Sequence, residues 1–94
     1  METVIKSQSS YVHEHKWAII VSRLVKSQMA ASGMTYADLS HKLEELGTHQ
    51  TPENLRVKIN RGNFGAQLFL LLFLVMGKTE ISLKDVESII DVSK

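Results

Sequence analysis

An unbroken run of apolar residues, Leu68 to Met76, constrains the fold of this chain more than any other feature. A helix over these nine residues is apolar on every side and must be covered on every side. The run is also far shorter than the ~20 apolar residues that span a bilayer. We therefore expect a core helix over residues 66–76. One of its faces would pack on the other helices, and the opposite face on the C-terminal segment, a partner subunit, or both.

A first helix is predicted over residues 13–32. Its apolar residues recur three and four positions apart from Trp17 onward, and we interpret Trp17 as a core anchor. Residues 1–12 show no such period and are expected to form a flexible arm. His13 and His15 are two positions apart, so they do not share a helix face. Because no cysteine or carboxylate cluster near them completes a site, we expect no metal ion there.

Two further helices are predicted from capping pairs. Thr35 and Asp38 are three residues apart, the spacing at which the two side chains cap each other's backbone N–H groups. Ser82 and Asp85 have the same spacing. The helices that these pairs open cover about residues 35–46 and 83–92.

The central helix has both of its ends marked in the sequence. Thr51 is a suitable N-cap, and Pro52 occupies the first helical position, where a missing N–H donor costs nothing. Gly62 supplies the left-handed residue that ends a helix. Between these ends, Leu55 and Ile59 lie four apart and form one narrow apolar stripe. We expect a helix over about residues 51–61 with this stripe facing the core.

The opposite face of helix 51–61 has the chemistry of a DNA-reading surface. Arginine pairs with guanine, asparagine with adenine, and an exposed valine contacts the thymine methyl group. This chemistry assigns Asn60 and Val57 on this face, and Arg56 on its flank, to base edges. Glu53 would accept a hydrogen bond from cytosine N4 or repel phosphate. The alternative for this face is a solvated surface with no ligand. The predicted DNA-binding residues, including those assigned to the phosphate backbone, are Gln50, Thr51, Glu53, Arg56, Val57, Lys58, Asn60 and Arg61.

Charge is distributed unevenly although the formal net charge is only +1. Residues 48–63 carry three cations against one carboxylate, a balance of +2, whereas residues 35–47 carry one cation against three carboxylates, a balance of −2. The small net charge gives no general attraction to nucleic acid. The positive charge is concentrated on the segment with the predicted reading face.

The remaining composition narrows the class of protein. A chain of 94 residues makes one domain, and the lack of cysteine excludes disulfides and thiolate metal sites and favours a reducing compartment. The first residues lack the apolar stretch of a secretory signal, so the cytoplasm is the simplest location. We expect no enzyme, because the sequence has no cysteine nucleophile, glycine-rich phosphate loop or suitable carboxylate pair. No cofactor or small-molecule ligand is expected either.

The order of these helices resembles the phage-repressor (Cro/C1, or XRE) class of helix-turn-helix domains. Met34 to Ser40 corresponds to the first helix of the motif, and Leu55 to Gly62 to the second. More closely, residues 17–77 are similar to a small bacterial domain family of unknown function. That family has a Trp-led first helix, a Thr-Tyr-Ala-x-Leu start and an Asn-Leu-Arg-x-Lys-Ile-x-Arg-Gly-x-Phe centre. The resemblance implies an all-α, five-helix domain of the lambda-repressor type over residues 13–94.

Two features depart from the repressor pattern. Ser40 stands where the first motif helix usually has alanine. The connection from Leu43 to Leu55 is about five residues longer than the usual tight turn, which sets how the second helix projects into the major groove. The longer connection either extends helix 35–46 and keeps the usual angle between the two motif helices, or tilts helix 51–61 away from that angle. Both alternatives stay open.

The sequence therefore favours a homodimeric transcriptional regulator that binds double-stranded DNA sequence-specifically. The alternative is a protein-interaction module that keeps the helix-turn-helix fold without contacting DNA, and the small net charge and long connection favour it. The dimer is inferred from helix 66–76, whose apolar surface is too large for one small domain to cover. The predicted dimer interface comprises Leu70, Phe73, Leu74, Ile89 and Ile90.

Overall fold

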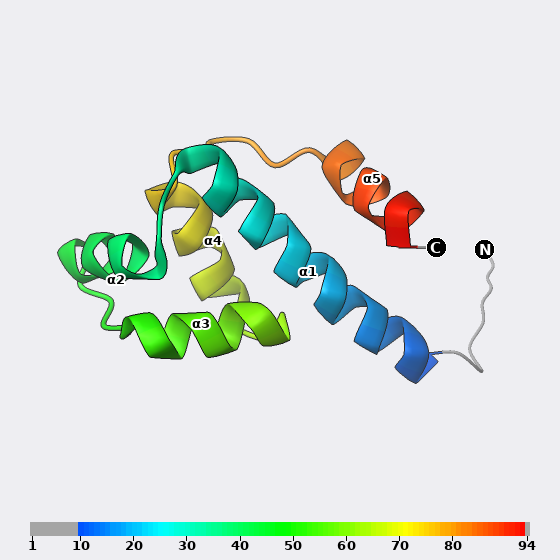
Figure 1. Cartoon of the computed structure of the whole chain (residues 1–94), viewed down its shortest axis with the longest axis horizontal. Helices are drawn as coiled ribbons and strands as arrows, with labels where there is room; N and C mark the ends of the chain where they lie inside the picture. The colour runs from blue at the N-terminus through cyan, green and yellow to red at the C-terminus, as the bar shows by residue number, and fades with distance from the viewer. Residues whose placement is uncertain (1–9, 94) are drawn as a thin grey trace.

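All five predicted helices are present in the computed structural model, which describes residues 10–93 of the chain. These residues contain no strand, so the all-α, five-helix prediction is confirmed (Figure 1). The first helix begins three residues before its predicted start, and residues 1–9 of the predicted arm lie outside the described part. The helices are α1 (Ser10–Ser32), α2 (Tyr36–Glu45), α3 (Pro52–Arg61), α4 (Ala66–Val75) and α5 (Leu83–Ser93).

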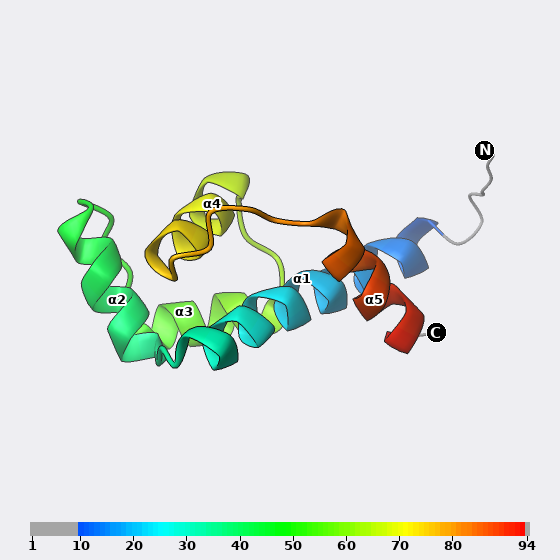
Figure 2. The same ribbon diagram turned by 90° about the horizontal axis from the view of Figure 1, so that it is seen from above.

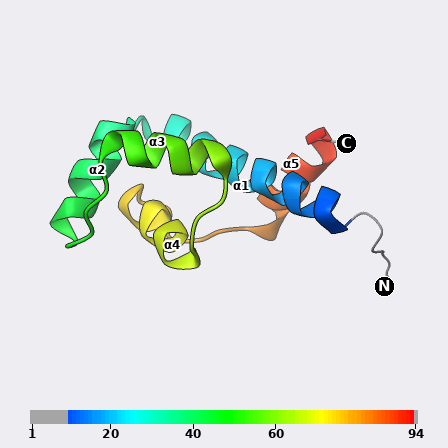
Figure 3. The same ribbon diagram turned by 90° about the horizontal axis from the view of Figure 1, so that it is seen from below.

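The long helix α1 is the axis of the molecule. It has 23 residues and runs along a structure that extends 43 Å in its longest dimension. Helices α2, α3 and α4 gather at one end, with α2 packed on both α3 and α4, whereas α5 lies toward the other end (Figures 1 and 2). Seen from below, α3 crosses directly in front of α1 (Figure 3). Among the described helices, α5 packs on α1 only.

The hydrophobic core lies between α1, α2, α3 and α4. Leu55 and Ile59 are fully buried in it, which confirms the inner stripe predicted for α3. Burial of an aliphatic side chain of this size contributes about 1.5–3 kcal/mol relative to exposure, so α3 is firmly attached. Val86 and Ile89 of α5 pack against the edge of the core. The buried core residues are Leu24, Val25, Leu39, Leu43, Leu55, Ile59, Leu72, Phe73 and Met76.

The helix-end predictions are confirmed for α2 and corrected for α5. The Asp38 amide donates to Thr35 Oγ1 at 3.1 Å, and the Thr35 amide donates to Asp38 Oδ2 at 2.9 Å, which completes a capping box. At α5, the Ser82 hydroxyl accepts instead from the Lys84 amide at 3.1 Å. The Asp85 carboxylate is 3.7 Å from Lys78 Nζ, because the preceding chain brings that ammonium group to the start of α5.

The interpretation of Trp17 as a core anchor is wrong. Its side chain is 50% exposed, whereas Ile20, one turn later, is buried. The core sits between α1 and α2–α4, and Trp17 lies toward the opposite end of α1. There it lines a surface recess with Lys16, Ile20 and Ile90. The three- and four-residue spacing therefore identified the correct stripe but not how far the core extends along it.

Helix α4 is covered on one face only. Phe73 is 2% exposed, whereas Leu70 and Leu74 on the outer face are 62% and 59% exposed. Of the two covers expected for this face, helix α5 does not provide one, because within residues 10–93 it packs on α1 and not on α4. Lys78, Thr79 and Ile81, which precede α5, only border a recess that Leu70 and Leu74 also line. No described helix combines the length and apolar character needed to cross a membrane.

Candidate nucleic-acid interface

Helix α3 is held in place at both ends. At its start, Thr51 Oγ1 accepts from the Asn54 amide at 3.0 Å, and Pro52 follows the cap. At its end, Gly62 has φ = 65° and donates to the Lys58 and Ile59 carbonyls. Gly62 is also buried against α1, so closely that a Cβ atom there would overlap the carbonyl group of Ala18. Glycine is thus required twice, for the left-handed conformation and for the close approach.

The face of α3 opposite Leu55 and Ile59 is largely open to solvent. Arg56 and Asn60 are exposed one turn apart, and Val57 between them is half-buried. The structure places the other predicted residues around them. Thr51, Glu53 and Arg61 are exposed, and Gln50 and Lys58 are half-buried.

Glu53 and Arg56 form a two-point ion pair on this face. Arg56 Nε donates to Glu53 Oε1 at 3.1 Å, and Arg56 Nη2 donates to Glu53 Oε2. This hydrogen bonding, followed by the positive charge of the guanidinium, lowers the pKa of the Glu53 carboxyl. The pKa of Arg56 is raised by the same contacts and, to a smaller extent, by Tyr36 in the first turn of α2. Arg56 therefore lies on the α2 side of α3.

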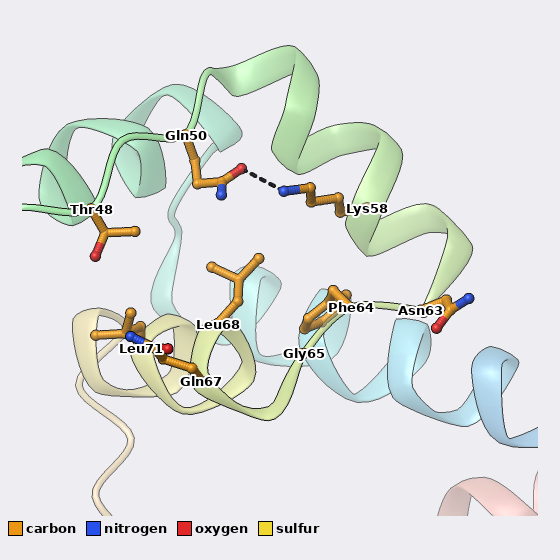
Figure 4. Close-up of a pocket in the computed structure, with 9 residues that line it drawn as sticks. All are labelled: Thr48, Gln50, Lys58, Asn63, Phe64, Gly65, Gln67, Leu68 and Leu71. Atoms are coloured by element: carbon orange, nitrogen blue, oxygen red, sulfur yellow. Dashed lines mark hydrogen bonds between the residues drawn. The ribbon is translucent and has the colours of Figure 1, made fainter.

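Lys58 lies on the other side of α3, toward α4. Its Nζ donates to Gln50 Oε1 at 3.1 Å, at the edge of a recess of about 410 Å³ (Figure 4). The side chains of Phe64, Leu68 and Leu71 give this recess an apolar lining. Arg56 and Lys58, both assigned to DNA from the sequence, thus leave α3 on opposite flanks.

The connection between α2 and α3 is an ordered part of this region. α2 ends at Glu45. Two residues later Gly47 has φ = 84°, and the amide of Thr48 donates to the Leu43 carbonyl at 2.9 Å, which closes the end of the helix. Ser40 then donates its hydroxyl to the Gln50 carbonyl at 2.6 Å. This role of Ser40 was not predicted, although an unusual serine beside an unusually long connection was a signal for it.

The predicted dimer-interface residues do not share one surface. Leu70 and Leu74 are exposed on α4, but Phe73 between them points into the core. Ile89 and Ile90 are half-buried on α5, which packs on α1. Phe73 lies on the side of α4 that is buried in the core together with Leu72 and Met76. The exposed apolar ridge of α4 consists of Leu70 and Leu74.

No group of three or more histidine, cysteine, aspartate or glutamate side chains within the described part of the chain is placed to hold a metal ion. The side chains of His13 and His15 are outside that part, so the expectation for them stays a prediction.

The chain matches the model of a family described as a domain of unknown function (DUF6471) over residues 17–81. The matched span contains most of α1, all of α2 to α4 and the long connection, but not α5. No curated protein and no solved structure matches the chain. The similarity to a small family of unknown function is confirmed, and the resemblance to phage repressors stays a hypothesis.

Proposed function

We propose that this chain, which belongs to the DUF6471 family, binds double-stranded DNA sequence-specifically as a homodimer and regulates transcription. Helix α3 is the proposed reading helix. One observation carries the proposal: Leu55 and Ile59 fix one face of α3 in the core, while Asn60 is exposed on the outer face and Arg56 on the flank beside it. These are the side chains that pair with guanine and adenine in the major groove. No catalytic step, cofactor or small-molecule ligand is part of the proposal.

The two flanks of α3 offer contacts to the phosphate backbone on either side of a groove. The α2 flank has the Tyr36 hydroxyl, and the α4 flank has the ammonium group of Lys58 beside Gln50. Phosphate contacts of this kind set the register of the protein without reading the sequence. We therefore assign base reading to Arg56, Val57 and Asn60, and backbone binding to Tyr36, Lys58 and Arg61.

The homodimer is supported by the apolar ridge of α4. Leu70 and Leu74 are both more than half exposed in the single chain, and exposed apolar patches mark interaction sites. A second copy on this ridge would bury them. A two-fold axis would also present two α3 helices to one face of the duplex, about 34 Å apart.

The test of DNA binding is selection from a random duplex pool, followed by titration of the selected site. We expect a palindromic sequence to be enriched. Arg56→Ala should weaken binding to this site by about 1–3 kcal/mol and relax the preference at one base position. Lys58→Ala should weaken binding to all duplexes alike and lower the slope of log affinity against log salt by about one per subunit.

Lys84→Ala is the matched control, because it removes one exposed lysine from α5, away from α3. Its salt slope should equal that of the parent, and all three variants should melt like the parent. If the parent binds every duplex weakly and without preference, DNA reading is wrong. The exposed ridge of α4 would then favour the second candidate, a protein-interaction module of the same fold.

A further inference from the structure

The ion pair between Glu53 and Arg56 occupies only one edge of the guanidinium group. Arginine has five N–H donors arranged in a planar fork. Glu53 accepts from Nε and from Nη2, which together form the side edge of the fork. The second donor of Nη2 and one donor of Nη1 point outward in the same plane and are left for another partner. These two donors form the end edge.

The end edge matches the acceptors of guanine. In the major groove guanine presents N7 and O6 side by side, and arginine binds both with two parallel hydrogen bonds. Glu53 and Arg56 are exposed in the first half of α3. The N-terminal residues of a recognition helix are those that contact base edges. A carboxylate on the side edge and a guanine on the end edge are therefore compatible.

We propose that Glu53 is a positioning residue, which holds the guanidinium plane of Arg56 so that its end edge reads a guanine. This role rests on the proposed DNA-binding function and replaces the predicted contact of Glu53 with cytosine. A long arginine side chain loses rotamer freedom when it docks on a base. The two-point pair removes part of that freedom before DNA is bound.

Glu53 also acts against wrong sites. Its carboxylate repels the phosphate backbone in every complex. Where Arg56 does not reach guanine, no base contact compensates for this repulsion. Specificity is a difference between affinities, and a repulsive group near the reading side chain increases that difference. Because the pair is exposed, it adds little to the stability of the fold. Its effect should appear in base discrimination.

The experiment compares Glu53→Gln with the parent on the selected duplex and on duplexes changed at the position where Arg56→Ala relaxes the preference. Glutamine keeps the size of the side chain and removes its charge. We expect discrimination for guanine at that position to fall roughly threefold to thirtyfold, which lies within the range of coupling between contacting residues. Affinity for random duplex should rise, and the melting temperature should not change.

Two controls show whether the effect acts through Arg56. Glu53→Gln added to Arg56→Ala should cause no further loss of discrimination at that position. Glu87→Gln, which removes an exposed carboxylate from α5, should keep the preference of the parent. In the free protein, NMR relaxation of the Arg56 Nε–H group should show faster motion in Glu53→Gln than in the parent.

The outcomes separate the positioning role from the proposed function. If the parent prefers guanine at that position and Glu53→Gln keeps the full discrimination, the positioning role is wrong and DNA reading stands. Equal mobility of the Arg56 Nε–H group in parent and variant would also overturn the positioning role. If the parent has no base preference at all, both are overturned.

Discussion

Ser40 links the helix before the long connection to the residue that precedes the α3 cap. Its hydroxyl donates to the Gln50 carbonyl at 2.6 Å, and the next residue, Thr51, caps α3. The alanine that is usual at this position in repressor-type helices has no such donor. The two departures from the repressor pattern, the serine and the long connection, are therefore one physical feature.

Ser40→Ala should lower the free energy of unfolding by about 1–2 kcal/mol, because the half-buried Gln50 carbonyl loses a hydrogen bond. Urea titration followed by circular dichroism measures the change. Ser27→Ala, which removes an exposed hydroxyl from α1, is the control and should have almost no effect. Equal losses in the two variants would show that the Ser40 bond does not hold the connection.

Asp38 makes stability depend on pH at the start of α2. The hydrogen bond from the Thr35 amide, followed by the one with the Thr35 hydroxyl, lowers the pKa of its carboxyl below the ordinary value of 3.8. An acid with a lowered pKa in the folded state adds stability above its ordinary pKa and loses it as the pH falls through the lowered value.

Asp38→Asn should therefore be less stable than the parent at neutral pH, and the difference should shrink as the pH falls below 3.8. Thermal melts of both proteins between neutral and acid pH measure this convergence. Glu87→Gln, on exposed α5, is the control and should follow the pH profile of the parent. A constant gap between Asp38→Asn and the parent at all pH values would contradict the role of the charged carboxylate.

At the scale of helices, the junction of α3 with α1 fixes the position of α3, the proposed reading helix. Gly62 ends α3 with positive φ and lies directly on the Ala18 carbonyl group. A side chain at this point would push the C-terminal end of α3 away from α1, while Leu55 and Ile59 hold its middle. The orientation of the outer face therefore depends on a residue that is not part of that face.

Gly62→Ala should be less stable than Gly47→Ala by about 1–3 kcal/mol, the usual effect of overpacking. Both glycines have positive φ, so each substitution carries a backbone strain of about 1–2 kcal/mol, but a Cβ atom at Gly47 would meet open space. Chemical denaturation of the two variants isolates the contact with Ala18. Similar stabilities would mean that α3 moves away from α1 without strain.

At the scale of the whole molecule, we expect the ridge of Leu70 and Leu74 to form the contact between the two copies of the proposed dimer. Sedimentation of the parent should give twice the chain mass of 10.6 kDa. Replacing both ridge residues by glutamate should give a folded monomer, because neither side chain belongs to the core. A charged group at a desolvated apolar contact is strongly unfavourable.

Leu83→Glu is the control for this experiment, since Leu83 is 77% exposed on α5. It should leave the dimer intact if α4 alone forms the contact. A parent that sediments as a monomer at micromolar concentration would remove the homodimer from the proposed function.

The sequence alone determined the number of helices, most of their ends and the inner face of α3. These features depend on contacts within one or two turns, such as the Thr35–Asp38 box, the Thr51 cap and the four-residue spacing of Leu55 and Ile59. Residues so close in the chain meet whenever the helix forms, so their types and spacing are sufficient evidence.

Only the tertiary structure decided which partners the outer residues of α3 have and what covers the apolar helix. The Arg56–Glu53 and Lys58–Gln50 pairs give partners to two cations that the sequence assigned to a base edge and to the phosphate backbone. The docking of α5 on α1 leaves Trp17 half exposed and α4 open at Leu70 and Leu74. These outcomes depend on where whole helices pack, and that is set by contacts between residues far apart in the chain, which no local spacing encodes.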